Sequence, residues 1–120
     1  MAHRYLRRRG CTVVARNYRP RAGGGEIDLV VRDRGRLVFV EVKTRASEDF
    51  GAPGDAVNAE KRTRLLHAAG DYARRVDARL DEARFDIVSV VLSAPPKIDW
   101  QRGAFGAAPD SRPARASRVR

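Results

Sequence analysis

The 120-residue sequence is short of several residue types, and each shortage narrows what the protein can be. It has one cysteine, Cys11, which cannot form an internal disulfide and has no companions for a zinc cluster. No apolar run approaches the roughly 20 residues that a membrane-spanning helix needs. The basic N-terminal stretch has no apolar segment behind it, unlike a secretory signal. We therefore expect one soluble cytoplasmic domain, with Cys11 as a small buried residue.

Acidic residues are absent from residues 1–22, and lysine is scarce throughout, with 3 lysines among 25 basic residues. Residues 1–22 carry a net charge of +7 and residues 107–120 carry +3, whereas residues 23–106 are neutral. Arginine suits phosphate because its planar fork can donate two hydrogen bonds at once, although a GC-rich genome also enriches it. The basic N-terminal region makes nucleic acid the first partner to consider. It lacks the large apolar anchors of a membrane-binding surface.

The hydrophobic pattern predicts a helix, three strands, a long helix and one or two further strands. The short Gly-containing connection at 33–35 indicates a β-hairpin. This order predicts an α/β fold with a mixed four- to five-stranded sheet, an N-terminal helix and one long crossover helix. The expected helices are 3–9, stopped by Gly10, and 58–80; the expected strands are 11–16, 26–32, 36–43, 85–92 and 97–100.

The long helix has an apolar stripe, formed by Leu65, Ala69, Tyr72, Val76 and Leu80. Such a stripe indicates one face packed on the sheet. We expect residues 1–106 to form one domain. Residues 107–120 mix small residues, proline and arginine without an apolar pattern, so we expect a disordered basic tail.

Charged residues stand inside the two most strand-like runs, where charge is unusual. Side chains alternate along a strand, so one face carries only apolar residues: Ile27, Leu29, Val31, Val38, Val40 and Val42. If that face is the core, the charged residues converge on the other: Glu26, Asp28, Glu41 and Lys43. The alternative is a solvated face with cross-strand ion pairs, each worth at most about 1 kcal/mol.

A divalent cation would relieve the repulsion between two carboxylates on adjacent strands. Magnesium, or manganese in its place, favours one or two carboxylates with waters and phosphate oxygens in the remaining positions. Asp28 and Glu41 are the candidate pair. Lys43, two residues after Glu41 on the same face, could orient a water or neutralise developing charge.

Asp28, a short gap and Glu41-Val42-Lys43 match the D…(D/E)xK signature of the restriction-endonuclease-like nuclease superfamily. Over about residues 5–105 the chain also resembles the YraN-like family of uncharacterised bacterial proteins. Archaeal Holliday junction resolvases are more distantly similar. The family resemblance rests on GEIDLVVRD (25–33), LVFVEVKTR (37–45), FGAPGDAV (50–57), Lys61…Arg64-Leu65, RFDIVSV (84–90) and Ile98…Ala104-Phe105.

The resemblance implies that residues 1–106 form a restriction-endonuclease-like domain, with a restriction-endonuclease-like core and a magnesium-dependent phosphodiesterase site acting on DNA. Asp28 and Glu41 would be metal ligands and catalytic residues, Lys43 the catalytic lysine, and Glu26 a carboxylate just outside the ligands. Structured or branched DNA and a homodimer follow only by analogy with the resolvases. Contacts to nucleic acid are expected from Arg7, Arg8, Arg9, Arg45, Lys61 and Arg64.

Two other functions stay open. The family's first helix carries a Gly-Glu pair that this chain lacks, so either the start is truncated or the site has lost a carboxylate. In the second case the protein would be a non-catalytic nucleic-acid-binding module with a degenerate nuclease fold. The third reading is a protein-interaction domain whose acidic face docks a partner.

Overall fold

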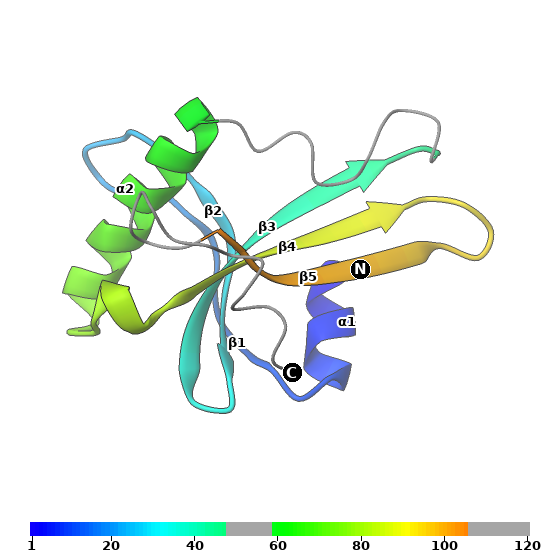
Figure 1. Cartoon of the computed structure of the whole chain (residues 1–120), viewed down its shortest axis with the longest axis horizontal. Coiled ribbons are helices and arrows are strands. Elements are labelled where there is room, and N and C mark those ends of the chain that lie inside the picture. Colours follow the sequence, from blue (N-terminus) through cyan, green and yellow to red (C-terminus); the bar gives the residue numbers. More distant parts are fainter. Residues whose placement is uncertain (48–58, 106–120) are drawn as a thin grey trace.

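A five-stranded mixed sheet with a helix against each face forms the body of the protein (Figure 1). The computed structural model describes residues 1–47 and 59–105, so the motif at 50–57, the expected helix start at 58 and the expected tail 107–120 lie outside the described residues. The expected order of elements is confirmed. It runs α1 (Ala2–Arg8), β1 (Thr12–Tyr18), β2 (Ile27–Asp33), β3 (Arg36–Arg45), α2 (Ala59–Arg75), the 3-10 turn η2 (Leu80–Glu82), β4 (Arg84–Val91) and β5 (Lys97–Phe105).

The strands lie across the sheet in chain order, β1-β2-β3-β4-β5. β3 and β4 are parallel and every other neighbouring pair is antiparallel. The expected hairpin joins β2 to β3, with Asp33 paired to Arg36. Arg34 and Gly35 both have positive φ, 56° and 86°, as a two-residue turn of a twisted hairpin requires. α2 belongs to the crossover that a parallel β3–β4 pair needs.

The apolar side chains of the sheet divide between two cores. On one face Leu29, Val31, Val38 and Val40 pack with Leu6 of α1. On the other face Val30, Leu37, Phe39 and Phe85 pack with Leu65, Ala68 and Ala69 of α2. The face that carries Asp28 and Glu41 is therefore also packed, against α2. The two acids lie beyond the apolar part of this face, near the end of the β2–β3 pairing.

Ile27 differs from the prediction that it shares a face with Leu29. It belongs to the core under α2. The β2–β3 pairing reaches only Leu29 opposite Val40, so Ile27 is paired with β1 alone, through Tyr18, and is not held to the alternation of the hairpin.

Both helices end at a residue with left-handed backbone. At α1 this is Gly10, as predicted, with φ 96° and a 3.0 Å hydrogen bond from the N–H of Cys11 to the carbonyl of Leu6. α2 ends at Arg75, so the prediction of a helix to Leu80 is wrong. Asp77 has φ 57°, and the N–H of Ala78 donates to the carbonyl of Ala73 at 2.8 Å, which closes the helix in a Schellman motif.

The buried stripe of α2 is correspondingly shorter than expected and richer in alanine. It consists of Leu65, Ala68, Ala69 and Ala73, while Val76 is 42% exposed. Small side chains let the helix lie close to the sheet. Within the described ranges, no helix is both long and apolar enough to span a bilayer.

Candidate functional site

The site lies where β2 and β3 part. Their ladder stops at the pair Leu29–Val40. Just beyond it, Oδ2 of Asp28 accepts a 2.8 Å hydrogen bond from the backbone N–H of Val42. The carboxylate thus takes the place that a strand carbonyl would hold, and β3 runs on beside β4 as far as Arg45. A polar side chain at this position ends one pairing without leaving the N–H of Val42 unsatisfied.

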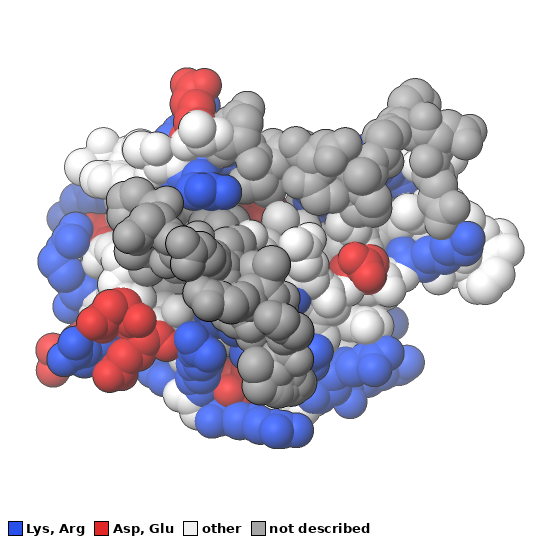
Figure 2. Space-filling view, viewed as in Figure 1, with Lys and Arg blue, Asp and Glu red and all other residues white. Residues whose placement is uncertain are grey.

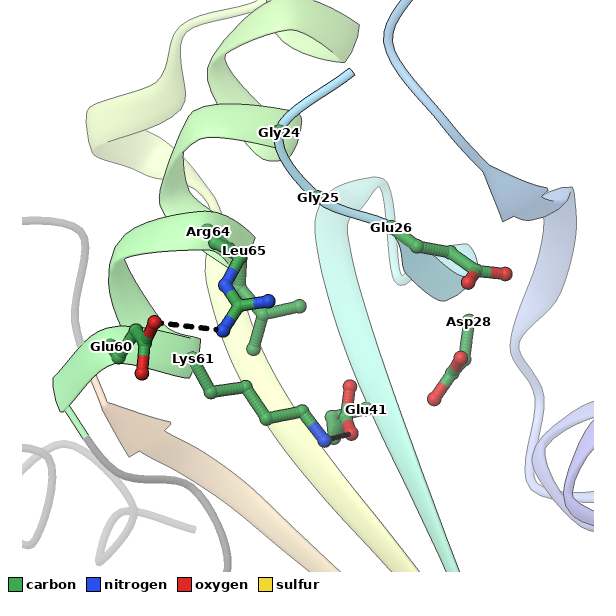
Figure 3. A pocket seen from close by; sticks show the side chains of 9 residues that line it. All are labelled: Gly24, Gly25, Glu26, Asp28, Glu41, Glu60, Lys61, Arg64 and Leu65. Atoms are coloured by element: carbon green, nitrogen blue, oxygen red, sulfur yellow. Dashed lines mark ion pairs between the residues drawn. The ribbon is translucent and has the colours of Figure 1, made fainter.

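A pocket of about 620 Å³ opens at this separation. Figure 3 shows the side chains of Asp28 and Glu41 facing it from neighbouring strands, with Lys61 and Arg64 reaching in from α2. Three of the four charged residues that the sequence singled out in the strands therefore line one pocket. Its full lining is Gly24, Gly25, Glu26, Asp28, Glu41, Glu60, Lys61, Arg64 and Leu65.

The glycines before β2 hold the chain against α2 at the rim of the pocket. A Cβ on Gly25 would lie 2.4 Å from the carbonyl oxygen of Arg64, and one on Gly24 would lie 2.9 Å from the ring of His67. Both residues have positive φ, 156° and 94°. Only glycine allows this approach without a shift of the loop or helix. The loop brings Glu26 to the pocket, where it pairs with Arg19 at 3.4 Å.

Glu41 is the most buried acid of the pocket, with 7% of its surface exposed. Its carboxylate forms an ion pair with Nζ of Lys61. Burial raises the pKa of Glu41, and the neighbouring charge of Asp28 raises it further, while the bond from Lys61 opposes both. The carboxylate pair is therefore costly to keep charged, and an ammonium group from α2 offsets part of that cost.

Lys43 lies two residues beyond Glu41 on β3 but is not part of the pocket lining. Burial lowers the pKa of Lys43, and the positive charge of Lys61 lowers it further, against the opposing charges of Glu41 and Asp28. The lysine is thus electrostatically coupled to the carboxylates without facing the cavity. A depressed pKa brings an amine closer to proton exchange near neutral pH.

The residues expected to contact nucleic acid fall into separate places. Lys61 and Arg64 line the pocket, where Arg64 also pairs with Glu60 at 3.1 Å. Arg45 is at the end of β3 and does not line it. The remaining three, Arg7, Arg8 and Arg9, are exposed at the end of α1. This helix packs on the face of the sheet opposite α2.

Sequence reasoning missed two features of the site. It took Lys61 for a phosphate contact and did not foresee its pairing with Glu41, because the rotation of α2 against the sheet leaves no trace in a single sequence. It also missed the rim formed by Gly24 and Gly25. The signal was present, since three glycines directly before a strand mark a close approach of the backbone.

The carboxylates suit a hard divalent cation that keeps most of its coordination as water and phosphate oxygen. Asp28 and Glu41 supply two oxygen-donating groups on one pocket. Among residues 1–47 and 59–105, no group of three or more His, Cys, Asp or Glu side chains is placed to hold a metal ion. Magnesium therefore fits this donor set only as a cation with few protein ligands, and Glu41 must release Lys61 to serve as one.

Comparison with known proteins identifies the family of the chain. The model of uncharacterised protein family UPF0102 matches residues 1–90, a range that includes every residue of the pocket. A UPF0102 protein of Solibacter usitatus is 70% identical over 105 residues, which are 88% of this chain and 80% of the relative. A UPF0102 protein of Ralstonia pickettii is 44% identical over 109 residues, 88% of this chain and 83% of the relative.

A more distant relative extends the match. A UPF0102 protein of Dictyoglomus turgidum is 41% identical over 98 residues, which are 81% of each chain. The match of the family model to most of the chain and the three relatives agree with the YraN-like resemblance of the sequence motifs. The chain belongs to the uncharacterised protein family UPF0102.

Proposed function

We propose that this protein is a metal-dependent nuclease of the restriction-endonuclease-like superfamily, which hydrolyses phosphodiester bonds of DNA with Mg²⁺ or Mn²⁺. The observation that supports it is one pocket that combines Asp28 and Glu41 with Lys61 and Arg64. Carboxylates attract a hard cation and basic side chains attract phosphate, so the pocket combines the two kinds of side chain that a phosphodiesterase site would use. Branched DNA as substrate and a homodimer as the active form belong to the same proposal.

A bound divalent cation would polarise a phosphate oxygen and lower the pKa of a bound water. Asp28 is prepared to hold it, because the hydrogen bond from Val42 fixes Oδ2 and leaves Oδ1 for another partner. Glu41 would be available as a second ligand if Lys61 released it. The freed ammonium could then offset negative charge on a bound phosphate.

Lys43 would support this chemistry through its electrostatic coupling to Glu41 and Asp28, since it lies outside the pocket lining. Burial and the charge of Lys61 lower the pKa of Lys43, which favours proton exchange with water near the carboxylates. Arg64 contributes a guanidinium at the opposite wall, on α2. It can exchange its exposed partner Glu60 for a phosphate at little cost, since surface ion pairs are weak.

Cleavage of defined DNA substrates tests the proposal. Supercoiled plasmid, single-stranded DNA and a four-way junction would be incubated with the purified protein and Mg²⁺ or Mn²⁺. We expect metal-dependent cleavage by the natural protein and none by Asp28→Asn or Lys43→Ala. Equal cleavage by the natural protein and Asp28→Asn would assign the cutting to a contaminant and overturn the site.

The second candidate is a non-catalytic nucleic-acid-binding protein with a degenerate nuclease fold. The ion pair between Lys61 and Glu41 favours it, because that pair balances the buried carboxylate without a metal. It predicts salt-sensitive binding that does not change when divalent cations are removed. Metal-dependent turnover that Lys43→Ala abolishes would exclude it.

A further inference from the structure

The basic surface of α1 lies apart from the pocket, whose lining includes no residue of this helix. Four arginines of the N-terminal segment are exposed: Arg4, Arg7, Arg8 and Arg9. Figure 2 shows Lys and Arg gathered at the lower right, over the region where Figure 1 places α1. No Asp or Glu precedes Glu26 in the chain. The helix therefore carries a positive charge that its own part of the sequence does not neutralise.

Two arginines are stacked on a pair of aromatic rings that joins α1 to β5. The guanidinium of Arg9 lies 4.5 Å from the ring centre of Tyr5, and that of Arg102 lies 3.7 Å from the ring centre of Trp100. The rings of Tyr5 and Trp100 meet edge to face at 6.3 Å. These contacts make a continuous arginine–aromatic row across the two elements.

A buried charge network fixes the ring of Trp100. Its Nε1 donates to Oδ2 of Asp86 at 2.8 Å, and the N–H of Gly103 donates to Oδ1 at 2.9 Å. Arg84 donates two hydrogen bonds of 2.9 Å to the same carboxylate and one of 2.8 Å to Asp33. Asp86 is 1% exposed, so this network lies in a low-dielectric interior and is stiff. The indole ring of Trp100 is therefore held in place, and the guanidinium of Arg102 stacks on it.

The stacked guanidiniums keep their hydrogen-bonding edges for a ligand. An arginine on an aromatic ring uses its flat face, while its N–H groups stay directed along the edge. Within the described part of the chain, no carboxylate forms an ion pair with Arg9 or Arg102. Asp99 alternates to the other face of β5 from Trp100. The row is thus rigid and positive.

We propose that α1 and β5 form a surface that binds the phosphate backbone of nucleic acid, centred on Arg9 and Arg102. Rigid guanidinium groups lose little conformational freedom when they bind phosphate. The row presents two of them, and Asp86, the acid beside Trp100, is already paired with Arg84. Binding of this kind is independent of sequence. The surface is on the face of the sheet opposite the pocket, so it does not depend on catalysis there.

An anionic membrane is the other polyanion that such a surface could meet. Stable attachment to a bilayer combines charge with apolar anchors. Among the described residues the exposed large apolar side chains are Met1, Val14, Val76 and Leu92. Of these, Met1 and Leu92 line a pocket with Ala2 and His3 at the start of α1, whereas Arg9 lies at its other end. The composition of the surface therefore favours nucleic acid.

Fluorescence anisotropy with a labelled duplex in EDTA tests the surface without cleavage. The variant Arg9→Gln/Arg102→Gln should bind about eightfold more weakly for each lost contact in 0.1 M salt, since each phosphate contact adds roughly 0.9 to the slope of log K against log salt. The matched control is Arg74→Gln/Arg79→Gln, which removes the same charge from exposed arginines paired with Asp71 and Asp81. Equal affinity of the two double variants would overturn the proposal.

Two further arms identify the ligand and the role of stacking. Arg9→Lys/Arg102→Lys keeps the charge and loses the planar fork, so we expect an affinity between those of the natural protein and the Gln variant. Full affinity of the Lys variant would overturn the role of the stacked rings. Binding to phosphatidylserine vesicles without binding to duplex would overturn the choice of nucleic acid.

The nuclease proposal can fail separately. Asp28→Asn leaves the arginine row untouched and should bind the duplex as the natural protein does. Binding by a protein that never cuts DNA would overturn the nuclease and support the surface. If the Arg9→Gln/Arg102→Gln variant cuts DNA with metal and binds the duplex with unchanged affinity, the nuclease is supported and the binding surface is overturned.

Discussion

Oδ2 of Asp28 accepts a hydrogen bond of 2.8 Å from the backbone N–H of Val42, at the point where their strands separate. The same carboxylate faces the pocket that holds Glu41. One side chain thus ends a ladder and supplies a charge to the site. The two roles make different demands, because an N–H needs only an acceptor whereas a cation needs the negative charge.

Substitution of Asp28 separates these roles. Asp28→Asn keeps an acceptor for Val42, so we expect a free energy of unfolding within about 0.5 kcal/mol of the natural protein. Cleavage should fall roughly 100-fold or more, since a ligand charge worth several kcal/mol is lost. Asp28→Ala removes the acceptor as well and should cost about 1–3 kcal/mol. Urea denaturation and a plasmid assay on both variants make the comparison; equal stability of the two would contradict the structural role.

Lys61 forms an ion pair with the carboxylate of Glu41, so removal of its ammonium group should strengthen the binding of a divalent cation there. In Lys61→Met, the nearly buried carboxylate of Glu41 loses its counter-ion. We therefore expect the melting temperature without metal to fall. Because the Lys61 ammonium no longer competes, Mn²⁺ should raise the melting temperature of the variant more than that of the natural protein. The control is Arg64→Met, whose partner Glu60 is exposed. Equal Mn²⁺ shifts in all three proteins would show that Lys61 does not compete with metal.

The element order and the hairpin followed from the sequence because they depend on local patterns. Alternation predicted correctly that Asp28 and Glu41 face the same side, and Gly10 marked the end of α1. These features are set by side-chain period and by backbone freedom, both visible in a single chain. The family resemblance also pointed to Asp28 and Glu41, and membership of the family is confirmed.

The tertiary partners could not be predicted in this way. Nothing local shows that Lys61 meets Glu41, or that Asp86 gathers Trp100 and Arg84 into a buried network. The end of α2 was missed because Asp77, rather than glycine, adopts the left-handed backbone. Asp tolerates that conformation less well than glycine, so its presence is a weak signal of a helix end. Whether the site residues act in catalysis is a question of chemistry, and those roles remain predictions.

The pH dependence of stability should carry the signature of Glu41. Burial and the charge of Asp28 raise the pKa of Glu41 above its ordinary value of 4.5, so the folded protein holds a proton that the unfolded chain releases. Stability from this group is complete below 4.5 and is lost as pH rises through the raised pKa. Glu41→Gln has no such titration. Its free energy of unfolding relative to the natural protein should therefore increase over this window, measured by urea denaturation at several pH values; a constant difference would contradict the raised pKa.

The contact between the glycine loop and α2 should be sensitive to a single methyl group. In Gly25→Ala the new Cβ would lie 2.4 Å from the carbonyl oxygen of Arg64, which is backbone and cannot turn aside. The loop or the helix must shift, at a typical cost of about 1–3 kcal/mol. Gly23→Ala is the matched control, because its φ of 83° adds backbone strain but nothing lies within 4 Å of the Cβ. We expect Gly25→Ala to lose more stability in urea than Gly23→Ala, and to lose cleavage as Glu26 and Arg64 move apart. Equal losses would mean that backbone strain alone matters and that the loop does not support the wall of the pocket.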